Sequence, residues 1–194
     1  KFDTIIGMEK IVITATAESI EQVKELLASG VDRIYVGEKD YALRLPHAFS
    51  YDDLREIASL VHEAGKELTV AANALMHQEM MDNIKPFLEL MKEIQVDYLV
   101  VGDAGVFYVN KRDGYHFKLI YDTSVFVTSS RQVNFWGQHG AVEAVLAREI
   151  PSEELFEMSK NLEIPAEVLV YGASVIHHSK RPLIQNYYNF THID

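Results

Sequence analysis

The chain has 194 residues, of which 48% are hydrophobic, so its length and composition predict one globular domain, residues 1–194, with a substantial core. The formal net charge of −11 argues against electrostatic binding of a nucleic-acid backbone over a large surface. Nucleic acid would therefore be bound only locally or through a partner. The absence of cysteine excludes disulfides and thiolate ligands for zinc or an iron–sulfur cluster.

The sequence contains no signal for membrane insertion or export. No apolar run approaches about 18 residues, and no basic and apolar leader opens the chain, which predicts a soluble cytoplasmic protein without membrane contact. Residues 1–7, which precede Met8, are either a natural extension or an added segment.

Seven apolar segments predict β-strands along the chain. Their runs are mostly continuous rather than alternating, which indicates burial on both faces, as in a parallel sheet covered by helices. In chain order the strands are KIVITA (10–15), DRIYVG (32–37), ELTVAAN (67–73), DYLVV (97–101), KLIYD (118–122), AVEAVLA (141–147) and AEVLVYG (166–172).

Amphipathic helices are predicted between these strands. Gly30, Gly65 and Gly140 fit the position just past a helix end, where glycine adopts a left-handed backbone at little cost. Ser19 and Ser50 are predicted helix starts. Spacings of three and four residues predict one apolar helix stripe made of Ile84, Phe87, Leu88, Met91 and Ile94.

Strands that alternate with helices predict an α/β fold. A doubly wound sheet is disfavoured because TATAES, rather than a glycine-rich phosphate loop, follows the first strand. We therefore expect a TIM-type (β/α) barrel. Such barrels usually have eight strands and about 250 residues, so the chain is predicted to lack its last unit at the C-terminal end. An open seam should remain, and a neighbouring chain, including a second copy, would cover it.

Five segments resemble, in the same order, the collagenase-like peptidases of peptidase family U32. They are YVGEKDYALR (35–44), GDAGVFYV (102–109), YDTSVFVTSS (121–130), LAREIPSEEL (146–155) and EIPAEVLVYGAS (163–174). The resemblance implies a (β/α) barrel and a family named for hydrolase activity of unknown catalytic type. It also implies a link to 5-hydroxylation of the wobble uridine of tRNA, with prephenate and an iron–sulfur cluster.

The family signature is a His-Gly-Ala start followed by two cysteines. Here the start reads Tyr171, Gly172 and Ala173, and the cysteine positions carry Val175 and Pro182. The resemblance therefore implies a short, cysteine-poor paralogue that holds no cofactor of its own and acts with a cysteine-bearing paralogue.

Polar side chains follow the strands at the end where (β/α) barrels carry their functional residues. The alternative for each is a polar strand exit or a helix cap. The substrate-binding candidates are Glu38, Arg44, Asn73, Asp103, Asp122, Thr123, Arg148, Glu149 and His177. No catalytic residue is assigned.

Arg44 and Arg148 are the most specific candidates, because a guanidinium binds a carboxylate through two parallel hydrogen bonds. Prephenate carries two carboxylates and would suit two arginines at one barrel mouth. The alternative is an internal ion pair of Arg148 with Glu38 or Glu149.

Two further features are predicted to be less specific. His177 and His178 are adjacent, and on an extended chain they point in opposite directions, so no metal site is expected there. The aromatic residues are predicted to be core and barrel exterior rather than base-stacking platforms, because basic residues are not densely interleaved with them: Phe117, Tyr121, Phe126, Phe135 and Trp136.

Three hypotheses about function remain open at this point. The first is a subunit of tRNA wobble-uridine hydroxylation. The second is a stand-alone collagenase-like protease, and the third is a non-catalytic barrel that binds a small anion or scaffolds a partner. Whether the isolated chain is an enzyme is left undecided.

Overall fold

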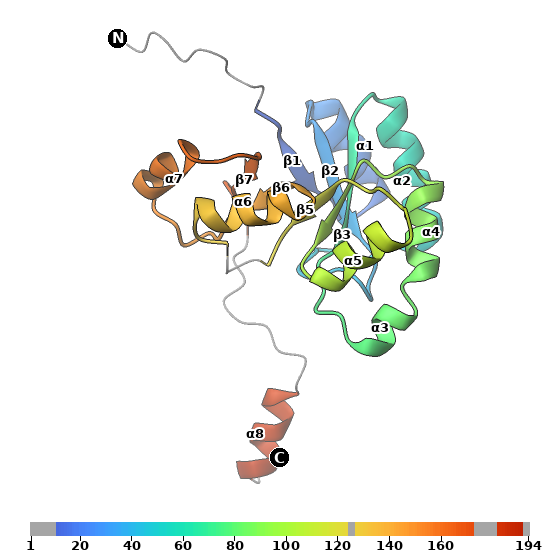
Figure 1. Ribbon diagram of the computed structural model, residues 1–194. Helices are drawn as coiled ribbons and strands as arrows, with labels where there is room; N and C mark the ends of the chain where they lie inside the picture. The colour runs from blue at the N-terminus through green and yellow to red at the C-terminus, as the bar shows by residue number, and fades with distance from the viewer. Residues whose placement is uncertain (1–10, 124–126, 173–181, 192–194) are drawn as a thin grey trace.

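The structure is a computed structural model that describes residues 11–123, 127–172 and 182–191. In these ranges strands and helices alternate along the chain (Figure 1). The strands are β1 (Thr14–Thr16), β2 (Arg33–Gly37), β3 (Glu67–Ala72), β4 (Tyr98–Val101), β5 (Leu119–Tyr121), β6 (Ala141–Val145) and β7 (Ala166–Glu167). The helices are α1 (Ile20–Ser29), α2 (Tyr51–Glu63), α3 (Gln78–Asp82), α4 (Lys85–Glu93), α5 (Ala104–Arg112), α6 (Ser130–Gln138), α7 (Ser152–Ser159) and α8 (Leu183–Thr191).

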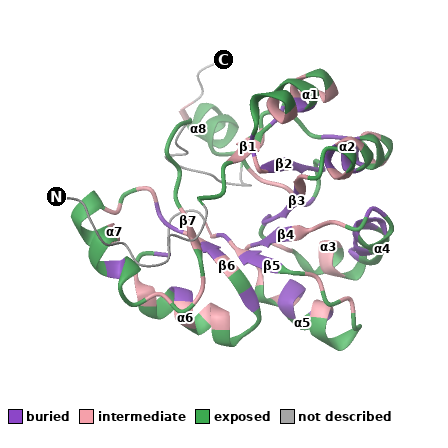
Figure 2. Cartoon of the chain, turned by 90° about the horizontal axis from the view of Figure 1, so that it is seen from above, coloured by how far each residue is buried: buried purple, intermediate pink, exposed green. Residues whose placement is uncertain are grey.

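The strands form one parallel sheet in the order β1-β2-β3-β4-β5-β6-β7. Figure 2 shows the sheet curved, with α1, α2, α4, α5 and α6 on its outer side. This order confirms the predicted barrel order and the α/β class. Within the described ranges no strand pairing joins β7 to β1, although the Thr14 hydroxyl on β1 donates a hydrogen bond of 3.4 Å to the Glu167 carboxylate on β7. The fold is therefore a half-barrel with an open seam.

The predicted helix ends are confirmed. Ser19 and Ser50 accept hydrogen bonds from the backbone of Gln22 and Asp53, and the Asp53 carboxylate also accepts from the Ser50 backbone N–H. Gly30 ends α1 with a φ of 94°, a left-handed conformation that residues with a Cβ rarely adopt. These local signals fix where each helix begins and ends around the sheet.

The hydrophobic core lies between the sheet and its outer helices. Alternate residues of β2 show the division: Ile34 and Val36 are buried in this core, whereas Arg33 and Tyr35 occupy the interior of the curved sheet. The predicted stripe on α4 is buried over its whole length, from Ile84 to Ile94.

The two outermost strands are shorter than predicted, so the strand predictions over 10–15 and 166–172 are wrong in extent. Ile11 is 78% exposed, and Val170 and Tyr171 are 90% and 95% exposed. Each of these runs has a neighbouring strand on one side at most, so most of its backbone donors and acceptors have no ladder partner to extend the strand.

The lower interior of the half-barrel, near the N-terminal ends of its strands, contains a charge cluster around the buried side chain of Arg33. Arg33, at the start of β2, pairs with Glu67 of β3 at 3.2 Å and with Glu143 of β6 at 3.1 Å. Its guanidinium also lies 4.1 Å from the ring centre of Tyr98. Because β2 and β6 are far apart in the sheet order, the contact with Glu143 crosses the interior.

Candidate functional site

The loop after β2 brings Arg44 to the mouth of the half-barrel. The Glu38 carboxylate accepts a hydrogen bond from the Asp40 backbone N–H at 2.8 Å, and the Glu38 carbonyl accepts one from Ala42 at 3.0 Å. Arg44 follows this turn with a φ of 60°, which is uncommon for a residue with a side chain. Strained positions of this kind occur preferentially at functional sites.

A hydrogen-bond network fixes the position of Arg44. Asp122, after β5, accepts from Arg44 Nη2 at 3.0 Å and from Asn73 Nδ2 at 2.8 Å. The Asn73 oxygen in turn accepts from the backbone N–H of Leu43 at 2.9 Å. Three predicted candidates from three different strand ends therefore meet in one site, and the ion pair at this site joins Arg44 to Asp122.

Gly102, directly after β4, allows this network to form. A Cβ at this position would lie 2.9 Å from the backbone oxygen of Asp122 and 3.0 Å from that of Asn73. The absence of a side chain at Gly102 lets the ends of β3 and β5 lie close to the end of β4. This glycine is not among the candidates predicted from the sequence, although a glycine at the end of a buried strand is a usable signal for close backbone approach.

A cavity of about 530 Å³ opens beside the network. Arg44, Asp122 and Arg148 line it together with Tyr35 from β2. Its remaining wall is formed by Thr16, Leu45, Pro46, Leu169, Tyr171 and Gly172. Two guanidinium groups and one carboxylate therefore border a partly apolar space, an arrangement that can bind an organic anion.

Tyr35 is a further residue of this site that is not among the candidates predicted from the sequence. Burial, with a contribution from the Asp122 carboxylate, raises the pKa of the Tyr35 phenol. The phenol therefore stays protonated and offers a neutral hydroxyl to the cavity. The period-two alternation of β2 could have indicated this inward position, because Arg33 and Tyr35 share one face.

Other candidates have different places. Asp103 accepts a hydrogen bond from the Gly105 backbone at 2.7 Å and caps α5, so the capping alternative describes it. Glu149 is exposed and does not line the cavity. Thr123 lies next to Asp122, and its Oγ1 is buried without a hydrogen-bond partner among the described residues. His177 lies outside the described residues.

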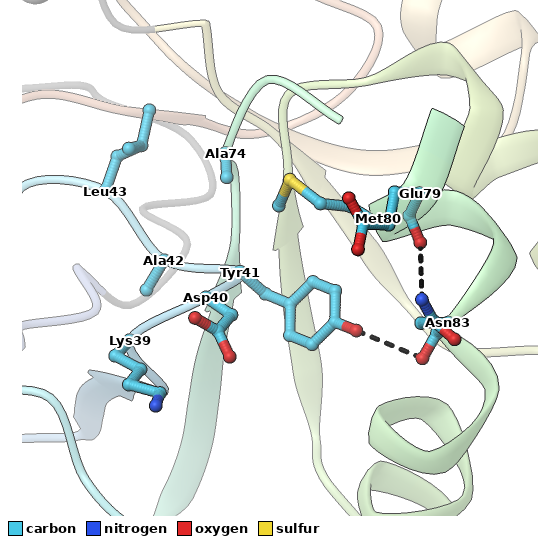
Figure 3. Close-up of a pocket in the computed structure, with 9 residues that line it drawn as sticks. All are labelled: Lys39, Asp40, Tyr41, Ala42, Leu43, Ala74, Glu79, Met80 and Asn83. Carbon is cyan, nitrogen blue, oxygen red and sulfur yellow. Dashed lines mark hydrogen bonds between the residues drawn. The ribbon is translucent and has the colours of Figure 1, made fainter. Parts of the chain in front are cut away.

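A second pocket of about 450 Å³ lies on the other side of the same loop. Residues 39–43 line this pocket, whereas residues 44–46 line the mouth cavity. Figure 3 shows the Tyr41 hydroxyl directed at the Asn83 backbone oxygen, to which it donates a hydrogen bond at 3.1 Å. The carbonyl of Tyr41 accepts from Ala74 at 3.0 Å, so this pocket is part of the scaffold that holds the loop.

The comparisons with known proteins agree with this architecture. Residues 18–192, which are most of the chain, match the sequence model of "Peptidase family U32". The chain belongs to peptidase family U32. A solved structure of this family, the U32 peptidase Mk0906, superposes with a TM-score of 0.71 at 13% identity and covers 96% of this chain and 78% of that one.

Two similar proteins come from one organism, Bacillus subtilis (strain 168). The chain is 32% identical over 183 residues to tRNA hydroxylation protein P2, covering 94% of this chain and 59% of that protein. It is 25% identical over 193 residues to tRNA hydroxylation protein P1, covering 96% of this chain and 46% of that protein. The chain thus spans about half the length of these relatives.

In the described part of the chain, no helix is long and apolar enough to cross a membrane.

Proposed function

We propose that this chain is a subunit in the prephenate-dependent 5-hydroxylation of the wobble uridine of tRNA, and that it acts in the cytoplasm with a cysteine-bearing paralogue. The observation that carries the proposal is the 32% identity to tRNA hydroxylation protein P2 over 94% of the chain. The two relatives in Bacillus subtilis, P1 and P2, are consistent with a pair of paralogues.

The mouth cavity is the proposed binding site for the dicarboxylate. Arg44 and Arg148 would each bind one carboxylate, because a planar guanidinium matches the two oxygens of that group. Asp122 and Asn73 act as positioning residues, since they hold Arg44 through the ion pair and the hydrogen-bond network. The protonated Tyr35 hydroxyl supplies a neutral hydrogen-bonding group beside them.

The iron–sulfur chemistry of the family does not fit the residues of this chain. There is no cysteine anywhere in the sequence, so no thiolate ligand is available. We propose that any cluster required for the reaction is held by the paralogue, and that this chain contributes anion binding and RNA contact.

The test is a comparison of tRNA from the native host with and without the gene for this chain. Digested tRNA is analysed by mass spectrometry for 5-hydroxyuridine and its derivatives at the wobble position. We expect deletion to lower their level, and expression of the wild-type chain to restore it. An unchanged level after deletion of this gene alone contradicts the proposal.

A non-catalytic barrel that scaffolds a partner is the second candidate. The observation that favours it is the ion pair between Arg44 and Asp122, because a paired arginine can serve structure alone. An Asp122→Asn variant that folds normally but loses complementation would favour the hydroxylation role over the structural one.

A further inference from the structure

A groove of about 790 Å³ lies between α5 and α6, on the outer face of the sheet and away from the mouth cavity. α5 packs on β4 and α6 packs on β6, so neither helix lies squarely over β5. Figure 2 shows α5 and α6 as neighbouring helices outside β5 and β6. Aromatic side chains line the groove between the two helices.

The floor of this groove is a packed aromatic cluster. Phe107 and Trp136 line the groove with ring centroids 5.1 Å apart, and Tyr121, which does not line it, stacks on Trp136 at 4.0 Å. Tyr121 and Trp136 pack against the core here, as the sequence predicts for them.

The walls of the groove are exposed. Phe135 is 50% exposed and its ring stacks on that of His139 at 4.1 Å, while Tyr108 on the facing helix is 63% exposed. Exposed aromatic side chains of this size on both sides of one groove offer π-faces to a planar ligand.

The charge of the groove differs from that of the molecule. The chain carries a net charge of −11, yet none of the described residues that line the groove is an aspartate or a glutamate. Lys111, His116 and His139 line it instead. Cationic and imidazole groups beside partly exposed aromatic rings are complementary to an anion that carries a flat ring.

From this geometry we infer that the groove binds single-stranded RNA, with a base stacked against Phe135 and Tyr108 and a phosphate near Lys111. Base stacking on aromatic side chains combined with a local positive charge is the general mode of single-strand recognition. The inference rests on the proposed function only in taking RNA as the natural ligand. The groove is distinct from the mouth, so it would hold a part of the RNA other than the reacting base.

The chain offers a direct reporter, because Trp136 is its single tryptophan and lines the groove. We expect a single-stranded oligouridylate to quench the fluorescence of Trp136 in a saturable way. Phe135→Ala and Tyr108→Ala should each weaken binding by about 5-fold or more, measured by anisotropy of the labelled oligonucleotide. Lys111→Gln should also reduce the dependence of affinity on salt by roughly one unit of slope.

The matched control is Phe156→Ala. Phe156 is 64% exposed on α7 and lies 4.5 Å from Lys160 Nζ, so it has the same chemistry away from the groove. Its replacement should leave affinity unchanged. RNA binding that leaves Trp136 unquenched, or that Phe156→Ala weakens as much as Phe135→Ala, overturns the inference.

Failure of this inference is separable from failure of the proposed function. Dicarboxylate binding at the mouth is followed by calorimetry and involves none of the groove residues. If the host loses hydroxylated tRNA on deletion while the groove variants bind RNA like the wild type, only the groove assignment fails. If the paralogue protects the groove from hydrogen exchange and RNA does not, the groove is a protein interface and the inference is wrong.

Discussion

Two arginines of the half-barrel, Arg33 and Arg44, differ in how far they are buried and in how many carboxylates they pair with. Arg33 lies in the lower interior with 4% of its side chain exposed, between the carboxylates of Glu67 and Glu143. Arg44 lies at the mouth with 21% of its side chain exposed, beside a cavity and one pairing carboxylate, that of Asp122. The comparison indicates that Arg33 stabilises the fold, whereas the guanidinium of Arg44 borders a cavity that has room for a ligand.

The lower interior and the mouth also differ in charge: the lower interior has more carboxylates than arginines, and the mouth has more arginines than carboxylates. In the lower interior three glutamates, Glu67, Glu143 and Glu167, surround one arginine, and burial together with Glu143 raises the pKa of Glu167 to about 7. At the mouth two arginines and one aspartate line the cavity. An entering anion is therefore stabilised at the mouth and repelled from the lower interior.

The largest expected effect comes from removing Arg33. Arg33→Met leaves two carboxylates without the guanidinium that neutralises them, so the free energy of unfolding should fall by about 3 kcal/mol or more. Urea denaturation followed by circular dichroism measures the change. The control is Arg55→Met, which removes an exposed arginine paired with Glu93 and should have little effect. A loss of less than about 1 kcal/mol for Arg33→Met would contradict the structural role.

The second prediction concerns the pH dependence that Glu167 produces. Its pKa is about 7 in the folded chain and near 4.5 in the unfolded chain, so the folded state binds the proton more tightly. Below pH 4.5 this group costs no stability, and the cost grows as the pH rises to 7 and is complete above it.

Glu167→Gln tests this directly. We expect the variant to be as stable as the wild type near pH 4.5 and more stable at pH 8 by roughly 3 kcal/mol. Denaturation midpoints of both proteins over this range provide the measurement. A difference between the two proteins that does not change with pH would show that Glu167 does not titrate as inferred.

Much of the fold could be predicted from local signals in the sequence. Glycine and serine at helix ends, and the apolar stripe that begins at Ile84, depend on neighbours within one helix, so no tertiary information is needed to find them. The edge strands could not be placed in this way, since an apolar run such as VLVYG becomes a strand only where a second strand pairs with it.

The candidate site could be predicted in part. A parallel sheet places all its strand ends at one edge, which is why Arg44, Asn73, Asp122 and Arg148 could be named together. The roles within the site could not be predicted, because they depend on side-chain direction. The ion pairs predicted from the sequence joined Arg148 to Glu38 or Glu149, whereas the structure pairs Arg44 with Asp122. Asp103 caps α5 and takes no part in the mouth cavity.

The most direct test of the mouth as an anion site is calorimetric titration of prephenate into the wild-type chain and its arginine variants. We expect binding by the wild type, and Arg44→Ala or Arg148→Ala should weaken it by roughly 1.5–3 kcal/mol, the range for hydrogen bonds to charged groups. Lysine at either position should rescue poorly, because it keeps the charge but lacks the planar fork. Arg55→Ala, far from the mouth, serves as the control, and circular dichroism confirms folding. Prephenate affinity that is unchanged in both folded alanine variants would contradict the account and leave these arginines as structural residues.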